Sequence, residues 1–155
     1  MEKTDITLTS SYHNKQFKAD VSFIRDGKAK PIILFLHGFK GFKDWGAFNL
    51  VADYFANAGF VFIKMNFSHN GLSLEEDFYF EDLEAFGQNN FSIELDDIDV
   101  LLKALIGENA PIDKKELDFK QIGIIGHSRG GTIALLKATE SQEIKAAVSW
   151  AAVDD

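Results

Sequence analysis

The spacing of the hydrophobic residues changes part-way along the chain, at Pro31. Before this point, residues 6–9 and 17–24 alternate between apolar and polar side chains, as strands with one buried face do. The sequence Arg-Asp-Gly at residues 25–27 then predicts a turn. We expect the two alternating segments to pair as an antiparallel hairpin.

After Pro31, apolar residues occur in short continuous runs, which are typical of strands buried on both faces of a sheet. These runs are residues 32–36, 60–63, 122–125 and 146–150. Between them, apolar residues at helical spacing predict helices that start at Asp44 and Ser92, both good N-cap residues, and a further helix through residues 133–136. The segment 68–90 is irregular, acidic and aromatic, and one short helix is expected near residues 81–86.

Strands that alternate with helices predict a parallel sheet, because right-handed crossovers place helices on both of its faces. We therefore predict an α/β fold: a doubly wound, mainly parallel sheet with helices on both faces and an antiparallel N-terminal hairpin. At 155 residues, 46% of them hydrophobic, the chain has the size and apolar content of one domain. No linker or repeat divides it, so residues 1–155 are expected to form a single domain.

The net charge of the chain argues against nucleic acids and anionic membranes as binding partners. Its net charge is −8 and its only arginines are Arg25 and Arg129, whereas nucleic-acid-binding surfaces gather Lys and Arg. The same charge gives no attraction to anionic membranes, and no apolar run approaches the roughly 20 residues of a spanning helix. There are no cysteines, and the N-terminus lacks the basic and apolar regions of a secretory signal. We expect a cytoplasmic protein that binds neither nucleic acid nor membrane.

The motif with the clearest chemical role in this chain is G-x-S-x-G at residues 126–130. It follows a predicted buried strand and precedes a predicted helix, so Ser128 is expected on a sharp turn at the C-terminal edge of the sheet, where flanking glycines avoid backbone collisions. The N-terminal amides of the helix favour negative charge near the serine. A glycine-rich turn with an incidental serine is the alternative. A phosphate-binding loop is excluded, since neither G-x-x-x-x-G-K-[ST] nor G-x-G-x-x-G occurs.

Two further segments accompany this motif. They are Leu36-His37-Gly38-Phe39 at the end of the first buried strand and Asn66-Phe67-Ser68 after the second. Together the three segments resemble the α/β-hydrolase superfamily, and within it the dienelactone-hydrolase and acyl-peptidase-like serine esterases. The resemblance covers nearly the whole chain in element order, but only about six of the usual eight strands. It implies an incomplete α/β-hydrolase domain, truncated before its last strands.

The resemblance implies a serine hydrolase that acts on a small-molecule carboxylic ester, thioester or amide through an acyl-enzyme on Ser128, without a metal ion or cofactor. The backbone N–H groups of Phe39 and Arg129 would form the oxyanion hole, each stabilising the transition state by roughly 3 kcal/mol. Trp45 would line an acyl pocket or pack against the following helix. The side chain of Arg129 would bind a substrate carboxylate or pair with an acid from residues 75–77.

The chain departs from the family order of serine, acid and histidine, because no histidine follows Ser128. Asp154 is the candidate for the acid. His37 is expected to shape the oxyanion loop and, with His69, to line the site, and His127 is expected to point away from the serine. None of them is expected to occupy the position of the general base. Without that base a serine hydroxyl is a poor nucleophile, and we expect this chain to be nearly inactive alone.

Two further expectations come from the C-terminal part of the sequence. The predicted last strand, residues 146–153, would be an unprotected sheet edge, which predicts self-association through it. The missing histidine also leaves a second function open, namely a non-catalytic binding or interaction module on the same scaffold.

Overall fold

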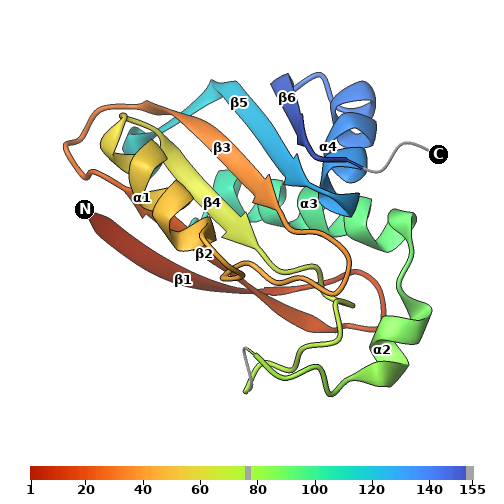
Figure 1. Cartoon of the computed structure of the whole chain (residues 1–155). Coiled ribbons are helices and arrows are strands. Elements are labelled where there is room, and N and C mark those ends of the chain that lie inside the picture. Colours follow the sequence, from red (N-terminus) through yellow and green to blue (C-terminus); the bar gives the residue numbers. More distant parts are fainter. Residues whose placement is uncertain (76–77, 153–155) are drawn as a thin grey trace.

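The computed structural model describes residues 1–75 and 78–152, in which six strands form one sheet in the order β1-β2-β4-β3-β5-β6 (Figure 1). The strands are β1 (Glu2–Thr9), β2 (Gln16–Phe23), β3 (Lys30–Leu36), β4 (Val61–Met65), β5 (Leu117–His127) and β6 (Ile144–Trp150). The helices are α1 (Phe48–Asn57), α2 (Leu83–Gln88), α3 (Phe91–Ile106) and α4 (Arg129–Glu140), with a short 3-10 helix at Lys114–Glu116. Each predicted strand is present, although β5 extends well beyond its predicted apolar run. β6 ends at Trp150, and residue 153, the predicted end of that strand, lies outside the described residues.

The two N-terminal strands form the predicted antiparallel hairpin. They pair over their full length, from Glu2 opposite Phe23 to Thr9 opposite Gln16. β2 also pairs antiparallel with β4, whereas β4, β3, β5 and β6 run parallel to one another. The prediction of a mainly parallel sheet with an antiparallel N-terminal hairpin is therefore confirmed.

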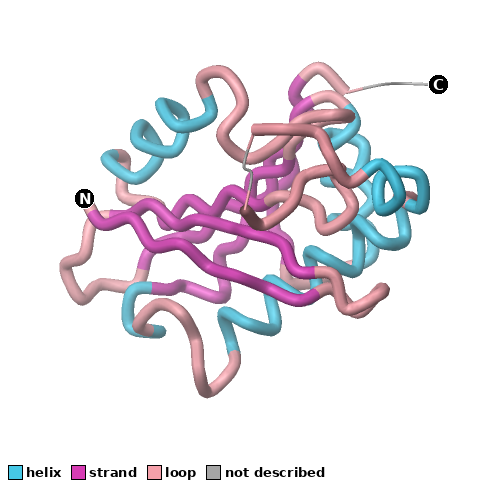
Figure 2. The backbone as a smooth tube through the Cα atoms, turned by 90° about the horizontal axis from the view of Figure 1, so that it is seen from below, coloured by secondary structure: helices cyan, strands magenta, loops and turns pink. Residues whose placement is uncertain are grey.

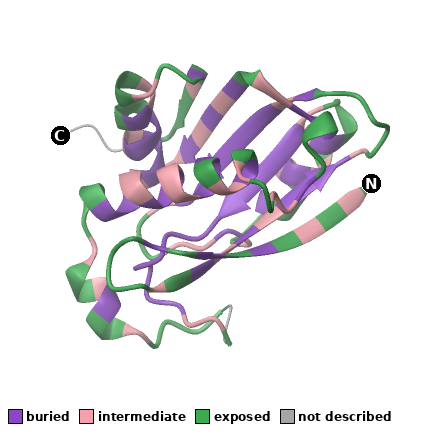
Figure 3. Ribbon diagram, turned by 180° about the vertical axis from the view of Figure 1, so that it is seen from behind, coloured by how far each residue is buried: buried purple, intermediate pink, exposed green. Residues whose placement is uncertain are grey.

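Each face of the sheet has its own apolar core. Alternate side chains of β3 point to opposite faces: Ile32 and Leu34 belong to the larger core, which includes residues of α3 and α4, whereas Ile33 and Phe35 pack with residues of α1. Figure 2 shows α1 on one side of the sheet and α3 on the other. The central strands are buried while the helices expose their outer surfaces (Figure 3). This is the predicted doubly wound α/β arrangement.

Two helices begin at residues other than those that the pattern predicted. α1 has Ala47 at its N-cap rather than Asp44, because the carboxylate of Asp44 is engaged by two lysine side chains. α3 has Asn90 at its N-cap rather than Ser92, and the Asn90 side chain accepts a hydrogen bond from the N–H of Ile93 at 3.2 Å. Within the described residues, no helix is long and apolar enough to cross a lipid bilayer.

The two edges of the sheet differ in how well they are protected. β1 carries the charged side chains Glu2, Lys3 and Asp5 in its first half, and these discourage pairing with another strand. β6 is bonded to β5 on one side only among the described residues, and its Val148 and Trp150 side chains are about half exposed. Val148 borders two apolar hollows beside α1, of about 340 and 430 Å³, and Trp150 borders the larger of them.

We expect the chain to self-associate through β6, because its unpaired edge adjoins exposed apolar side chains. Sedimentation velocity should show a mass that rises with concentration for the unmodified chain and stays monomeric for Val148→Lys. The matched control is Leu83→Lys on the exposed surface of α2, which adds the same charge away from the edge. An unmodified chain that stays monomeric at its highest soluble concentration would contradict this expectation.

Candidate active site

Ser128 is the single residue between the end of β5 and the start of α4. Its backbone has φ 54° and ψ −125°, a region that a residue with a side chain rarely occupies. Its N–H donates to the carbonyl of Trp150 at 2.9 Å, and its own carbonyl accepts from Gly131 N–H at 2.8 Å. The sharp strand-to-helix turn that the motif predicts is present.

The glycines on either side of Ser128 allow backbone segments to approach more closely than side chains would. A Cβ at Gly126 would lie 1.9 Å from the carbonyl oxygen of Gly130. One at Gly130 would lie 2.4 Å from the carbonyl oxygen of His37. The N-terminus of α4 therefore packs directly on the end of β3, which carries the predicted oxyanion loop.

The loop after β3 lies against Ser128. A Cβ at Gly38 would lie 3.0 Å from the Cβ and 3.5 Å from the Oγ of Ser128. The next residue, Phe39, exposes most of its ring and packs against Phe86 of α2, with ring centroids 5.3 Å apart. The structure thus brings together Ser128, Phe39 and Arg129, the three residues that the sequence assigned to nucleophile and oxyanion hole, within one turn and one adjoining loop.

His37 is buried behind this loop and braces it. Its Nε2 accepts a hydrogen bond from the N–H of Phe67 at 3.2 Å, so in the neutral ring the proton is on Nδ1, which donates to the carbonyl of Gly38 at 2.8 Å. Burial lowers the pKa of His37 to about 4, so the ring is uncharged at neutral pH. His37 shapes the loop, as expected. It was also predicted to line the site, but it is buried and does not line the hollow beside Ser128.

A buried cluster of charges holds the following part of the loop. Lys43 contacts Asp20 at 2.7 Å and also Asp44, while the fully buried Lys64 contacts Asp44 at 2.6 Å and Asp20 at 3.4 Å. Burial opposes ionisation, but hydrogen bonds to the two carboxylates raise the pKa of Lys43. The side chain of Asn66 accepts from the Lys43 N–H at 2.7 Å. The charges of the two lysines and the two aspartates therefore balance one another, and their contacts hold the loop at residues 43–44.

The loop after β4 has its own network, which involves His69. The Nδ1 atom of His69 lies 2.6 Å from the Oγ of Ser68, and its Nε2 lies 3.0 Å from the Nδ1 of His13 in the β1–β2 turn. These two histidines border a separate hollow with Lys15 and Asp82. His69 was predicted to line the site, but the structure does not place it in the hollow beside Ser128.

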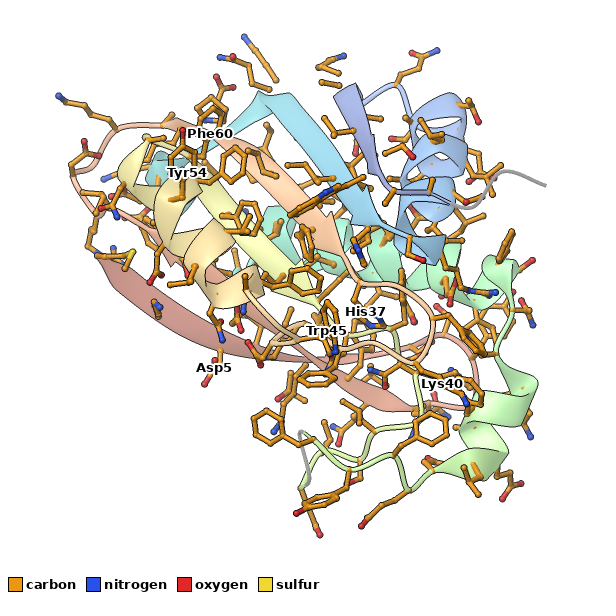
Figure 4. The ribbon with its side chains drawn as sticks, viewed as in Figure 1. Asp5, His37, Lys40, Trp45, Tyr54 and Phe60 are labelled. Atoms are coloured by element: carbon orange, nitrogen blue, oxygen red, sulfur yellow. The ribbon has the colours of Figure 1, made fainter. Side chains whose placement is uncertain are left out.

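That hollow has a volume of about 170 Å³. Its lining residues are Gly38, Phe39, Lys40, Gly41, Trp45, Phe48, His127 and Ser128. Trp45 lines this hollow and also packs against Phe48 at the start of α1, so its position fits either predicted role. The larger hollows beside α1 do not contain Ser128, and we therefore assign the candidate site to the smaller one. Figure 4 shows His37, Lys40 and Trp45 together beyond the C-terminal ends of β3 and β4.

Sequence reasoning missed two residues of this hollow, Phe48 and His127. His127 was expected to point away from the site, but its ring stacks on Trp45 at 6.1 Å and meets Phe48 edge-on at 5.6 Å. The signal available for Phe48 was its helical spacing, which indicated only a core position. Asp154, the predicted acid, lies outside the described residues.

The side chain of Arg129 has a partner that the sequence did not indicate. Its Nε lies 3.0 and 3.1 Å from the two carboxylate oxygens of Glu94 on α3, and its guanidinium stacks on Phe91 at 4.4 Å. Burial raises the pKa of Glu94, and the bonds from Arg129 act in the opposite direction. The expected ion pair is present, but its acid comes from α3 rather than from residues 75–77.

The sheet order, the strand-turn-helix at Ser128 and the adjoining loop define an α/β hydrolase fold. A family model described as the dienelactone hydrolase family matches residues 20–153, and the chain belongs to that family. No curated protein sequence matches the chain significantly.

Solved structures support the fold assignment. A hypothetical protein from Pseudomonas aeruginosa has a TM-score of 0.73 and 21% identity, covering 99% of this chain and 43% of its own. An acylaminoacyl peptidase from Pyrococcus horikoshii has a TM-score of 0.73 and 19% identity, covering 98% of this chain and 23% of its own. An esterase from Pyrococcus furiosus has a TM-score of 0.69 and 20% identity, covering 97% and 51%. The chain thus spans about half or less of the length of these similar proteins.

Replacing Gly126 or Gly130 by alanine should destabilise the fold by roughly 3 kcal/mol or more, because the added methyl groups meet rigid backbone atoms. Urea unfolding followed by circular dichroism measures this loss. Gly87→Ala is the control, since no atom lies within 4 Å of its added Cβ and it lies within α2. It should be neutral or stabilising by up to about 1 kcal/mol. Equal effects at Gly87 and Gly130 would contradict the packing described here.

The buried Asp97, which accepts the Ser68 N–H at 2.7 Å, should give the stability a distinctive pH dependence. Burial raises the pKa of Asp97 from 3.8 to about 6. Between these two pH values the folded state keeps a proton that the unfolded state releases, so the free energy of unfolding falls as the pH rises. His37 acts oppositely: with its pKa lowered from 6.5 to about 4, stability rises with pH through that window.

Asp97→Asn removes only the first of these contributions. The free energy of unfolding should then rise more steeply with pH between about 4 and 6.5 than in the unmodified chain. Urea unfolding at a series of pH values tests this, with Asp5→Asn on the outer face of β1 as control (Figure 4). Identical pH slopes for Asp97→Asn and the unmodified chain would rule out the raised pKa.

Proposed function

We propose that this chain carries the nucleophile of a serine hydrolase that cleaves a carboxylic ester, thioester or amide through an acyl-enzyme on Ser128. The observation that supports it most is the strained backbone of Ser128, at φ 54°, on a turn pressed against the Gly38 loop. Strain of this kind persists only where the surrounding structure enforces it, and it concentrates at functional sites. Membership of the dienelactone hydrolase family supports hydrolysis as the reaction class.

In the proposed reaction, the Oγ of Ser128 attacks the carbonyl carbon of the substrate and its proton passes to a general base. The carbonyl oxygen becomes an oxyanion that accepts hydrogen bonds from the backbone N–H groups of Phe39 and Arg129, at the N-terminus of α4. The bond to the leaving group breaks, the leaving group takes up the proton, and the acyl group stays on Ser128. A water molecule then repeats the sequence and releases the carboxylic acid.

The general base in this proposal lies outside these 155 residues. No histidine follows Ser128 in the sequence. The upstream histidines have other partners. His37 is buried and hydrogen-bonded through both nitrogens, and His69 bonds to Ser68 and His13. His127 lies in the hollow, where its ring packs against Trp45, Phe48 and Trp150. Asp154, which follows β6, remains the proposed acid. We therefore expect full activity from the product of the complete gene and slow turnover from this chain alone.

A fluorophosphonate probe tests the nucleophile directly. The protein expressed from its complete gene should be labelled and should hydrolyse p-nitrophenyl acetate, and Ser128→Ala should lose both properties, by a factor on the order of a million in kcat. Ser92→Ala, at an exposed position of α3, should keep both. Labelling that persists in Ser128→Ala would overturn the assignment. Failure of the unmodified protein to be labelled would instead favour the non-catalytic binding module.

A further inference from the structure

The two residues proposed to form the oxyanion hole, Phe39 and Arg129, are far apart in the sequence, but one short segment contacts the side chains of both. This segment is residues 83–94, which comprise α2 and the start of α3, and we refer to it as the α2–α3 segment. We propose that its residues Phe86 and Glu94 are positioning residues, which set the placement of the two oxyanion N–H groups by holding the side chains of Phe39 and Arg129. This inference rests on the proposed function and extends it to residues outside the hollow beside Ser128.

The α2–α3 segment surrounds the guanidinium of Arg129 with three side chains. The Nε of Arg129 lies 3.0 and 3.1 Å from the carboxylate oxygens of Glu94, and its Cζ lies 4.4 Å above the ring centroid of Phe91. Glu94 is buried, and the Nδ2 of Asn89 donates a further hydrogen bond to its Oε1 at 2.8 Å. A buried carboxylate held in this way fixes the position of its cation, because separating the pair would leave a charge buried without a partner.

The other donor residue is contacted by the same segment. Phe39 packs against Phe86 with ring centroids 5.3 Å apart, and Phe86 in turn meets Phe80 edge-on at 4.6 Å. The ammonium of Lys40 lies over the rings of Phe39 and Phe80, at 5.8 and 5.9 Å. Because Phe39 is 61% exposed, loss of the Phe86 ring would leave its side chain with little packing.

The construction of the α2–α3 segment allows it to hold both side chains at a fixed separation. The C-cap of α2 and the N-cap of α3 are the adjacent residues Asn89 and Asn90, so no loop separates the two helices. The hydrogen bond from Asn89 to Glu94 crosses this junction. Further along, α3 buries Ile98 and Leu101 in the larger apolar core. Both donor residues are therefore anchored to that core through one unit.

The relative placement of the two N–H groups matters because both must reach the same oxygen atom. Each donor has to lie about 2.7–3.1 Å from the oxyanion, and a misplacement of about 1 Å can lower the rate by a factor on the order of a hundred. Among the described residues, neither the Phe39 N–H nor the Arg129 N–H donates to a carbonyl in a turn, loop or cap, so both are available to an oxyanion. The contacts of Gly126 and Gly130 fix the course of the backbone. We infer that the side-chain contacts adjust the orientation of the two peptide groups within that course.

The test measures hydrolysis of p-nitrophenyl acetate and inhibition by a trifluoromethyl ketone, with the protein expressed from its complete gene. Such a ketone adds reversibly to a serine hydroxyl, and its oxygen then lies in the oxyanion hole as an anion, as in the transition state. Glu94→Gln removes the charge but keeps the shape, and should lower kcat about ten- to hundredfold with little change in KM. The affinity for the ketone should fall by the same factor. Glu84→Gln, which removes the same charge from an exposed position of the same segment, should change neither quantity.

A double variant tests whether Glu94 acts through Arg129. Arg129→Met keeps the backbone N–H but removes the guanidinium, and should lower kcat to a similar extent. Adding Glu94→Gln to this variant should cost no further activity, because the group that Glu94 held is gone. Effects that multiply would show that Glu94 acts independently of Arg129, which contradicts the proposal.

The second contact is tested at Phe86. Phe86→Ala removes the ring that packs on Phe39, and should lower both kcat and the affinity for the ketone. Leu83→Ala, on the exposed surface of α2, is the matched control and should leave both unchanged.

The outcomes distinguish a positioning role from a structural one and from failure of the proposed function. Lower stability reduces the amount of active protein but not the inhibition constant, so a lower kcat with unchanged ketone affinity would overturn the inference. If hydrolysis depends on Ser128 but Glu94→Gln changes neither quantity, the inference fails and the hydrolase proposal stands. If no ester is turned over in a Ser128-dependent manner, the proposed function itself fails. Circular dichroism checks the fold of each variant; should Glu94→Gln not fold, Phe86→Ala carries the test, and unchanged ketone affinity in it rules the inference out.

Discussion

The N-terminus of α4 packs on the end of β3 at a distance that only glycine permits. The positions where Cβ atoms would stand at Gly126 and Gly130 are already occupied by carbonyl groups of the neighbouring backbone. This contact forces the chain to reverse from strand to helix within one residue and leaves Ser128 with a positive φ. It also brings the loop after β3 against the serine. The geometry of the candidate site thus depends on the absence of side chains at Gly126 and Gly130.

The loops around Ser128 are held mainly by buried polar groups. His37 links the oxyanion loop to the end of β4 only while its ring is neutral, because its Nε2 must accept a hydrogen bond. Lys43, Lys64 and their two carboxylates fix the next part of the same loop. Bonds of this kind are directional and define one arrangement, whereas apolar packing alone tolerates several. The shape of the hollow beside Ser128 therefore depends on the protonation of residues that do not line it.

Much of the fold follows from the sequence, because strand and helix leave distinct apolar periods and the G-x-S-x-G motif occurs at a junction of the two. The hairpin, the parallel strands and the position of Ser128 were all predicted on this basis. Helix starts were less predictable: both Asn90 and Ser92 are good caps, and the sequence does not show which side chain reaches the free N–H groups. Asp44 failed as a cap because two lysines, one of them twenty residues away on β4, bind its carboxylate.

The contacts around the site were harder to predict than the site itself. The pairing of Arg129 with Glu94, and of His69 with His13, joins segments that are distant in the sequence and carry no periodic signal. The orientation of His127 depends on the rings of Trp45, Phe48 and Trp150, which come from the loop after β3, from α1 and from β6. Local sequence patterns identify residues that are chemically suited to a site. Which of these residues contact one another depends on the tertiary packing, which the local pattern does not show.

The place of β3 in the sheet has a consequence for how the chain is made. β3 lies between β4 and β5, and its Leu36 pairs with Gly126. On the ribosome, the first four strands emerge well before β5 does, and until then the apolar β3 keeps one edge open to other chains, a condition that invites aggregation and calls for chaperones. The strained turn at Ser128 forms only after this late pairing. A partly synthesised or partly folded molecule therefore lacks the conformation on which the candidate site depends.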